Sequence, residues 1–172
     1  KSFIKSINSI LYQESMINYE RAELITTLSI VVIEGKKLYA ANIGDSRVYL
    51  HRDEKLNQLS HDHVMNEKGF EHVLTQALGI SETTDTYYFE NIIKKGDKIL
   101  LCSDGLYNTL SKKEIEENIN NSASFLVKKA SSKVNDNLLD DTTAVIVEIL
   151  EDNEVEVLKA LNLPIPKKLT KG

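Results

Sequence analysis

Lys98-Ile-Leu-Leu-Cys-Ser-Asp-Gly-Leu106 is a short apolar run that ends in an acidic turn. The uninterrupted apolar residues 99–102 predict a strand that is covered on both faces. Gly105 permits a sharp turn, and Ser103 or Asp104 can cap a helix that begins near Leu106. We therefore expect Asp104 at the mouth of a buried strand, where a cation or a phosphate could reach its carboxylate.

Asp140-Asp-Thr-Thr-Ala-Val-Ile-Val-Glu-Ile-Leu150 has the opposite arrangement, because its acidic residues come before the apolar run. If the two strands are antiparallel neighbours, the end of the first lies beside the start of the second. Asp104 and Asp140 then converge at one edge of the sheet. Two such carboxylates repel each other, so we expect a divalent cation to neutralise them, and carboxylate oxygens suit Mg²⁺ and Mn²⁺.

The composition is typical of one globular domain, with 172 residues of which 41% are hydrophobic and 27% charged. The formal net charge of −5 offers no footprint for nucleic acid or an anionic membrane. The single cysteine, Cys102, lies in the apolar run and is expected to be a core residue and not a nucleophile. A chain that cannot form an internal disulfide fits a reducing compartment, and we expect a cytoplasmic location.

Alternating and β-branched residues predict an antiparallel meander in the first half of the chain. Gly44-Asp45-Ser46 is expected to be one of its turns, with an Asp45–Arg47 ion pair that locks a hairpin. A phosphate-binding loop is less favoured there, because the segment lacks the glycine density and the following helix of such loops. The predicted strands are residues 27–33, 37–43, 47–52, 56–59, 86–93, 98–102 and 142–150.

Helical spacing of apolar residues predicts helices over 2–18, 64–78, 106–110, 112–119 and 122–134. In the first of these, Phe3, Ile7, Ile10 and Leu11 are expected to pack on the core. Ser111 with Glu114 three residues later forms a capping box.

The other segments of note are a histidine-rich loop and the end of the chain. His61-Asp62-His63 could hold part of a zinc site, but zinc needs three or four protein ligands, so an ordinary loop is favoured. The Pro- and Lys-rich residues after Leu163 suggest a linker. We therefore divide the chain into a domain, residues 1–152, and a tail, residues 153–172.

Taken together and in order, these motifs resemble the metal-dependent protein phosphatase family (type 2C, or PPM). The Gly-Asp turn at 96–97 precedes the strongest of them, which is residues 101–106. The matching stretches are Thr26-Thr27-Leu28, Asn42-Ile43-Gly44-Asp45-Ser46-Arg47, Leu59-Ser60-His61-Asp62-His63, Leu101-Cys102-Ser103-Asp104-Gly105-Leu106 and Asp140-Asp141-Thr142-Thr143.

The resemblance implies an α+β fold, an α-β-β-α sandwich of two antiparallel sheets flanked by helices, with a binuclear Mn²⁺/Mg²⁺ centre at one edge. It implies hydrolysis of phosphoserine and phosphothreonine on proteins, in which metal ions activate water and no protein nucleophile is required. Asp104 and Asp140 match metal ligands of the family. The implied partners are phosphorylated proteins and a cognate Ser/Thr kinase, with no nucleic acid and no membrane.

The chain also departs from the family pattern. The Asp-Gly-x-Gly-Gly motif, which supplies further metal contacts, has no match, Ile25 stands in place of a Gly, Asp141 replaces the usual Asn, and the flap after His63 is short. We therefore expect an incomplete domain with part of the ligand set and little or no activity. Exposed sheet face and unpaired strand edges would favour its self-association. The alternative is a non-catalytic phosphatase-like module for binding or regulation.

Overall fold

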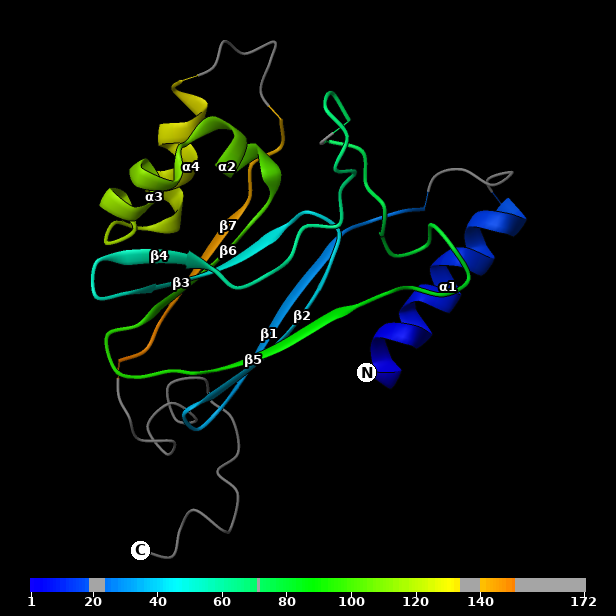
Figure 1. Ribbon diagram of the computed structural model, residues 1–172, viewed down its shortest axis with the longest axis horizontal. Coiled ribbons are helices and arrows are strands. Elements are labelled where there is room, and N and C mark those ends of the chain that lie inside the picture. Colours follow the sequence, from blue (N-terminus) through cyan, green and yellow to red (C-terminus); the bar gives the residue numbers. More distant parts are fainter. Residues whose placement is uncertain (19–23, 71, 134–139, 151–172) are drawn as a thin grey trace, which may run out of the picture.

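The computed structural model describes residues 1–18, 24–70, 72–133 and 140–150, so the predicted tail lies outside the described residues. Helices and strands alternate in blocks along this part of the chain (Figure 1). In chain order they are α1 (Ser2–Asn18), β1 (Leu28–Glu34), β2 (Lys37–Ile43), β3 (Arg47–Arg52), β4 (Lys55–Gln58), β5 (Tyr87–Ile92), β6 (Lys98–Cys102), α2 (Asp104–Thr109), α3 (Lys112–Asn118), α4 (Ala123–Ser131) and β7 (Ala144–Glu148).

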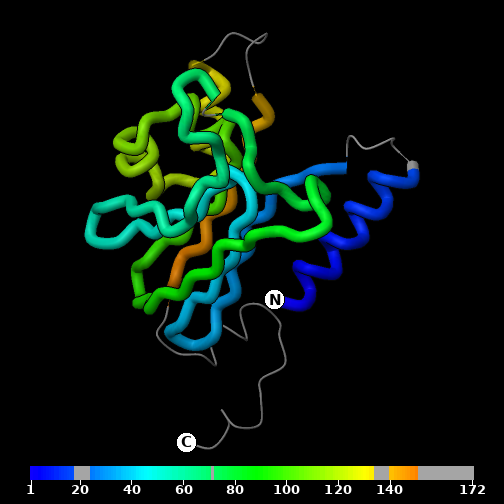
Figure 2. The backbone as a smooth tube through the Cα atoms, turned by 45° about the vertical axis from the view of Figure 1, so that its right-hand side comes forward, coloured from blue at the N-terminus to red at the C-terminus, as the bar shows by residue number. Residues whose placement is uncertain are grey.

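The strands form two antiparallel sheets, one of order β1-β2-β5 and one of order β4-β3-β6-β7. Helix α1 lies on the side of the first sheet, and α2, α3 and α4 lie together on the side of the second (Figures 1 and 2). The predicted α+β class and the α-β-β-α sandwich are confirmed.

Each pair of adjacent layers encloses its own apolar cluster among the described residues. Leu38, Val48 and Ile99 lie between the two sheets. Leu56, Leu100 and Leu106 belong to the cluster beneath α2, α3 and α4. Ile4 and Ile43 anchor the cluster between α1 and the first sheet. Because fully burying one such side chain contributes about 1.5–3 kcal/mol, these clusters fix the stacking of the layers.

The predicted meander is wrong at one connection, because β2 and β3 belong to different sheets. Strand β2 is already flanked by β1 and β5, so the chain leaves the first sheet after Ile43 and enters the second at Arg47. Gly44 adopts φ +93° at this crossover, a backbone conformation that residues with a Cβ rarely adopt. A Cβ at this position would also collide with the side chain of Thr27. Residues 44–46 are thus a connection between sheets and not a hairpin turn.

The helix predicted over 64–78 is also absent from the described residues of that segment. Its backbone pairs with other segments, because Thr75 N donates to His63 O, Met65 N to Val73 O and Leu78 N to Thr26 O. Gly69, with φ +92°, reverses the chain within it. Tertiary hydrogen bonds have therefore replaced the i to i−4 ladder that the apolar spacing suggested.

Helix α1 has the predicted bounds, and Ile7 and Leu11 pack on the core as predicted, but Phe3 and Ile10 do not. Ile4 and Asn8 are buried, whereas Phe3 is 67% and Ile10 59% exposed. The Asn8 amide donates to the carbonyls of Ser81 and Glu82, and its Oδ1 accepts from Gly79 N. A polar residue therefore occupies the middle of the packed face, which an apolar count cannot reveal. The capping box at the start of α3 is confirmed.

None of the helices in the described part of the chain combines the length and apolar character that crossing a bilayer requires.

Candidate functional site

The end of β6 and the segment before β7 are joined by one serine. Ser103 Oγ donates to Asp141 O at 3.0 Å and accepts from Thr143 N at 2.9 Å. Ser103 N also donates to Thr143 O at 3.1 Å. These bonds extend the antiparallel pairing of β6 with β7 past its last register pair, Cys102 with Ala144. The acidic residues that follow β6 and precede β7 are thereby brought to the same edge.

Gly105 allows this approach to be close. A Cβ at this position would lie 2.7 Å from Thr142 Oγ1, 2.8 Å from Asp141 O and 3.1 Å from Asp140 O. Two of these three atoms are backbone oxygens, which cannot rotate away. A side chain at residue 105 would therefore push the 140–142 segment away from the start of α2.

Asp104 and Asp140 lie within electrostatic reach of each other at this edge, as the antiparallel pairing predicts. Burial, then repulsion from Asp140 and from Asp45, raises the pKa of the Asp104 carboxyl above its ordinary value. Each carboxylate also accepts a local backbone bond, Asp104 Oδ1 from Gly105 N and Asp140 Oδ1 from Asp141 N. The role of this pair as metal ligands stays a prediction.

Asp45 is a third carboxylate of the edge, although the sequence predicts that it forms a hairpin ion pair with Arg47. Burial raises the pKa of Asp45, and repulsion from Asp62 and Asp140 adds to that effect. Strand β6 lies between β3 and β7, with Arg47 opposite Cys102, so Asp45 enters β3 beside the point where Asp104 leaves β6. The signal in the sequence was the acidic residue before a strand, the same one that identified Asp140.

Arg47 pairs with Asp62 and not with Asp45, which corrects the predicted ion pair. Its Nη2 lies 2.6 Å and its Nε 2.8 Å from Asp62 Oδ2. The guanidinium also donates to Tyr49 Oη and lies 3.5 Å from the centre of the Tyr107 ring. Burial alone would lower the pKa of Arg47, but the bonds to Asp62 and Tyr49 outweigh it and raise that pKa.

A polar network holds the crossover that carries Asp45. Buried Asn42 donates from Nδ2 to Gly44 O and His61 O, and Ser29 Oγ donates to Ser46 O at 2.9 Å. Tyr107 Oη donates to Asp45 O at 2.9 Å. The crossover is therefore fixed from the first sheet, from the 61–63 loop and from α2.

The structure does not assemble a zinc site around His61-Asp62-His63. The segment is an irregular loop, in which the Asp62 carboxylate pairs with Arg47. Among the residues that the structure describes, no three His, Cys, Asp or Glu side chains gather as a metal-binding group. The acidic edge offers carboxylate oxygens, the ligand type that suits Mn²⁺ and Mg²⁺.

Cys102 lies just behind this edge and is buried, as the sequence predicts. Burial raises the pKa of the Cys102 thiol to about 12, so the thiol stays protonated at neutral pH. Both its burial and its protonation agree with the predicted role as a core residue.

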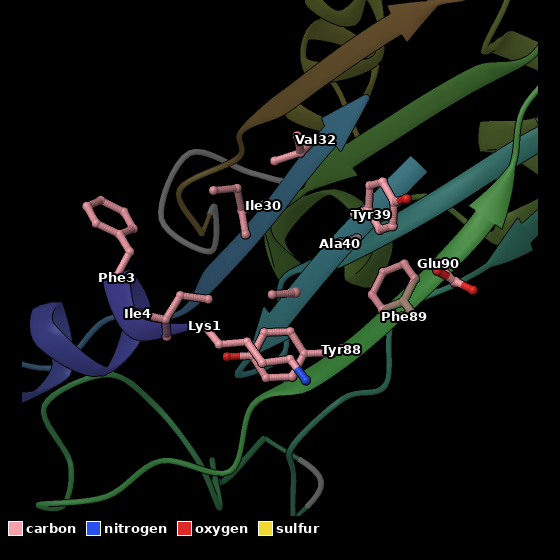
Figure 3. A pocket seen from close by; sticks show the side chains of 11 residues that line it. Lys1, Phe3, Ile4, Ile30, Val32, Tyr39, Ala40, Tyr88, Phe89 and Glu90 are labelled. Atoms are coloured by element: carbon pink, nitrogen blue, oxygen red, sulfur yellow. The ribbon is translucent and has the colours of Figure 1, made fainter. Parts of the chain in front are cut away.

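An apolar groove lies away from the acidic edge, between the start of α1 and the outer face of the first sheet (Figure 3). Its volume is about 510 Å³. Ile30 and Val32 of β1 lie on the same face of the sheet as Tyr88 of β5, and Lys1 Nζ lies 4.8 Å from the Tyr88 ring centre. None of its lining residues belongs to the acidic edge.

Comparison with known proteins gives consistent matches. A family model described as Protein phosphatase 2C matches residues 5–150. The serine/threonine phosphatase stp of Listeria monocytogenes is 29% identical over 168 residues, which covers 84% of this chain and 65% of the relative. Protein phosphatase PhpP of Streptococcus pneumoniae is 30% identical over 147 residues, covering 74% of this chain and 59% of the relative. The chain thus spans less than two thirds of the length of these relatives.

Solved structures show the same likeness in three dimensions. PppA of Pseudomonas aeruginosa has a TM-score of 0.78 and 25% identity, over 86% of this chain and 66% of that chain. The catalytic domain of the serine threonine protein phosphatase PstP, in complex with two manganese ions, has a TM-score of 0.74 and 25% identity, over 87% of this chain and 70% of that chain.

Proposed function

Because the chain belongs to the protein phosphatase 2C family, we propose that its acidic edge takes part in metal-dependent hydrolysis of phosphoserine and phosphothreonine on proteins. The observation that carries this proposal is the convergence of Asp104 and Asp140 at the ends of adjacent antiparallel strands. The manganese ions bound by the related PstP catalytic domain support the choice of cofactor.

Asp104 and Asp140 would hold Mn²⁺ or Mg²⁺ as part of the ligand set of a two-metal centre. The fit rests on their chemistry, because both groups offer only oxygen. Burial and then repulsion from Asp140 raise the pKa of Asp104, and a cation would relieve that repulsion. When bound, such ions polarise a phosphoryl oxygen and activate water for attack.

Other residues of the acidic edge would hold the two carboxylates in place. Ser103 and Gly105 keep the 140–142 segment against the start of α2, and therefore keep the two carboxylates together. Asp45 adds negative charge from the third strand. No side chain is required to attack phosphorus, which agrees with the buried and protonated Cys102.

The wider setting is part of the same proposal. Residues 1–152 would form one cytoplasmic domain with residues 153–172 as its tail. Its substrates would be proteins phosphorylated by a Ser/Thr kinase. Because the carboxylates named here are part of a ligand set, we expect this chain by itself to bind Mn²⁺ and to hydrolyse phosphate esters weakly or not at all.

The deciding experiment is Mn²⁺ titration by calorimetry, with hydrolysis of a phosphothreonine peptide measured in parallel. Asp104→Asn and Asp140→Asn should each weaken Mn²⁺ binding at least tenfold, because each removes one charged ligand. Asp53→Asn is the matched control, since Asp53 is 76% exposed and pairs with Lys94 away from the edge. The non-catalytic alternative predicts that neither substitution at the edge changes Mn²⁺ binding or hydrolysis, and that result would overturn the proposal.

A further inference from the structure

The crossover that carries Asp45 is bound at both backbone polar groups of one residue, Gly44, by a single residue of the 61–63 loop. Gly44 N donates to His63 Nδ1 at 3.1 Å, and His63 N donates to Gly44 O at 3.1 Å. His63 therefore satisfies both backbone polar groups of the residue just before Asp45.

The amide bond sets the tautomer of His63. A backbone N–H is always a donor, so Nδ1 must present its lone pair and the ring proton must lie on Nε2. The contact of Nδ1 with Gly44 O, at 3.4 Å, would need the opposite tautomer and is longer. His63 thus acts through Nδ1 as an acceptor.

Gly44 is a position at which this acceptor matters. Its φ of +93° is open to glycine but disfavoured for residues with a Cβ, and its Cα is packed against Thr27. Because glycine has this wide conformational freedom, hydrogen bonds are needed to hold the backbone here in one orientation. On its other side Asp45 is held at its own carbonyl by Tyr107, so the backbone of Asp45 lies between two anchored groups, Gly44 and Asp45 O. Arg47, further along, is occupied by Asp62 and does not reach Asp45 as an ion-pair partner.

We propose that His63 is a positioning residue, which holds the Gly44 amide through Nδ1 and thereby directs the Asp45 carboxylate toward Asp104. His63 touches neither carboxylate in this arrangement and acts only through the backbone. The inference rests on the proposed function for its consequence in metal binding, and on the hydrogen bond itself for its structural part.

Two substitutions separate the acceptor from the bulk of the ring. His63→Asn places an amide oxygen at the same number of bonds from Cα as Nδ1, so it can accept from Gly44 N. His63→Leu keeps an apolar side chain of comparable size but leaves the Gly44 amide without an acceptor. His61→Leu is the control for loss of a neighbouring ring, because the exposed His61 side chain contacts the rings of His63 and Tyr87 while its backbone carbonyl accepts from Asn42.

The primary measurement is the hydrogen-exchange rate of the Gly44 amide by NMR. His63→Leu should accelerate exchange at least tenfold, whereas His63→Asn and His61→Leu should stay within threefold of the unsubstituted chain. Mn²⁺ affinity should fall about tenfold in His63→Leu only, because an unsatisfied amide reorients the turn. A purely structural role would instead make Asn as damaging as Leu at position 63.

The outcomes separate the two proposals. Unchanged Gly44 exchange in His63→Leu, or equal losses in His63→Leu and His63→Asn, would overturn the positioning role. If the unsubstituted chain fails to bind Mn²⁺, the proposed function fails, and Gly44 exchange still decides whether His63 holds the turn. If Mn²⁺ binding is normal in His63→Leu while Gly44 exchange rises, Asp45 is not directed by this bond and the inference is wrong.

Discussion

Gly105→Ala tests whether close approach of two segments creates the acidic edge. Within α2 the substitution should favour folding by up to about 1 kcal/mol, because alanine is the better helix former. The added Cβ, however, would meet Thr142 Oγ1 at 2.7 Å and Asp141 O at 2.8 Å. Overpacking of this kind costs about 1–3 kcal/mol. The cost of overpacking should therefore exceed the gain in helix propensity, and the free energy of unfolding should fall by roughly 1 kcal/mol.

The assay is thermal unfolding together with Mn²⁺ titration. A loss of roughly 1 kcal/mol lowers Tm by about 2–4 °C in a chain of this size. Because the displaced segment carries Asp140, Mn²⁺ affinity should fall about tenfold as well. Asn108→Ala on the exposed side of the same helix is the control and should change neither quantity. A Tm at or above that of the unsubstituted chain, with normal Mn²⁺ binding, would refute the close-approach argument.

Three further predictions concern the scaffold. Ser111→Ala removes the capping box with Glu114 and should cost about 1 kcal/mol of unfolding free energy, measured by urea denaturation. Burial raises the pKa of Asp97, but bonds from Arg52 outweigh it and lower that pKa. The pair therefore stabilises the fold above about pH 4 and the stabilisation is lost as pH falls further, so Asp97→Asn should flatten the acid limb of the pH–Tm curve. The chain should self-associate in light scattering, and Val32→Lys, at a site 54% exposed beside the apolar groove, should reduce it; a concentration-independent monomer would count against this.

The local parts of the fold were predictable from the sequence. The strand 98–102 and the capping box depend on residues that are neighbours in the chain, and both are observed. The assignment of β2 and β3 to separate sheets was not predictable, because a short glycine-containing connection looks the same in a hairpin and in a crossover. The helix predicted over 64–78 was wrong, because hydrogen bonds to other segments outweighed the helical spacing of its apolar residues.

The candidate site divides in the same way. Asp104 and Asp140 could be placed together by reasoning from strand ends, since antiparallel pairing fixes which ends meet. Asp45 was missed because its position depends on which strand flanks β6 on the other side. The partner of Arg47 was missed for a related reason, because Asp62 is 15 residues away and reaches it only once the loop folds back.

The reactivity of the buried Cys102 thiol can be used to measure local opening of the chain around it. The side chain sits at the last residue of the strand that ends in Asp104, and it is the only thiol in the sequence. A thiol-specific reagent can react only with molecules in which the end of β6 has opened locally. The labelling rate therefore reports the fraction of molecules in this open state. Ions that bind the neighbouring carboxylates in the closed state lower the fraction of open molecules by mass action. The resulting decrease in labelling rate measures the affinity of these ions without any phosphate ester.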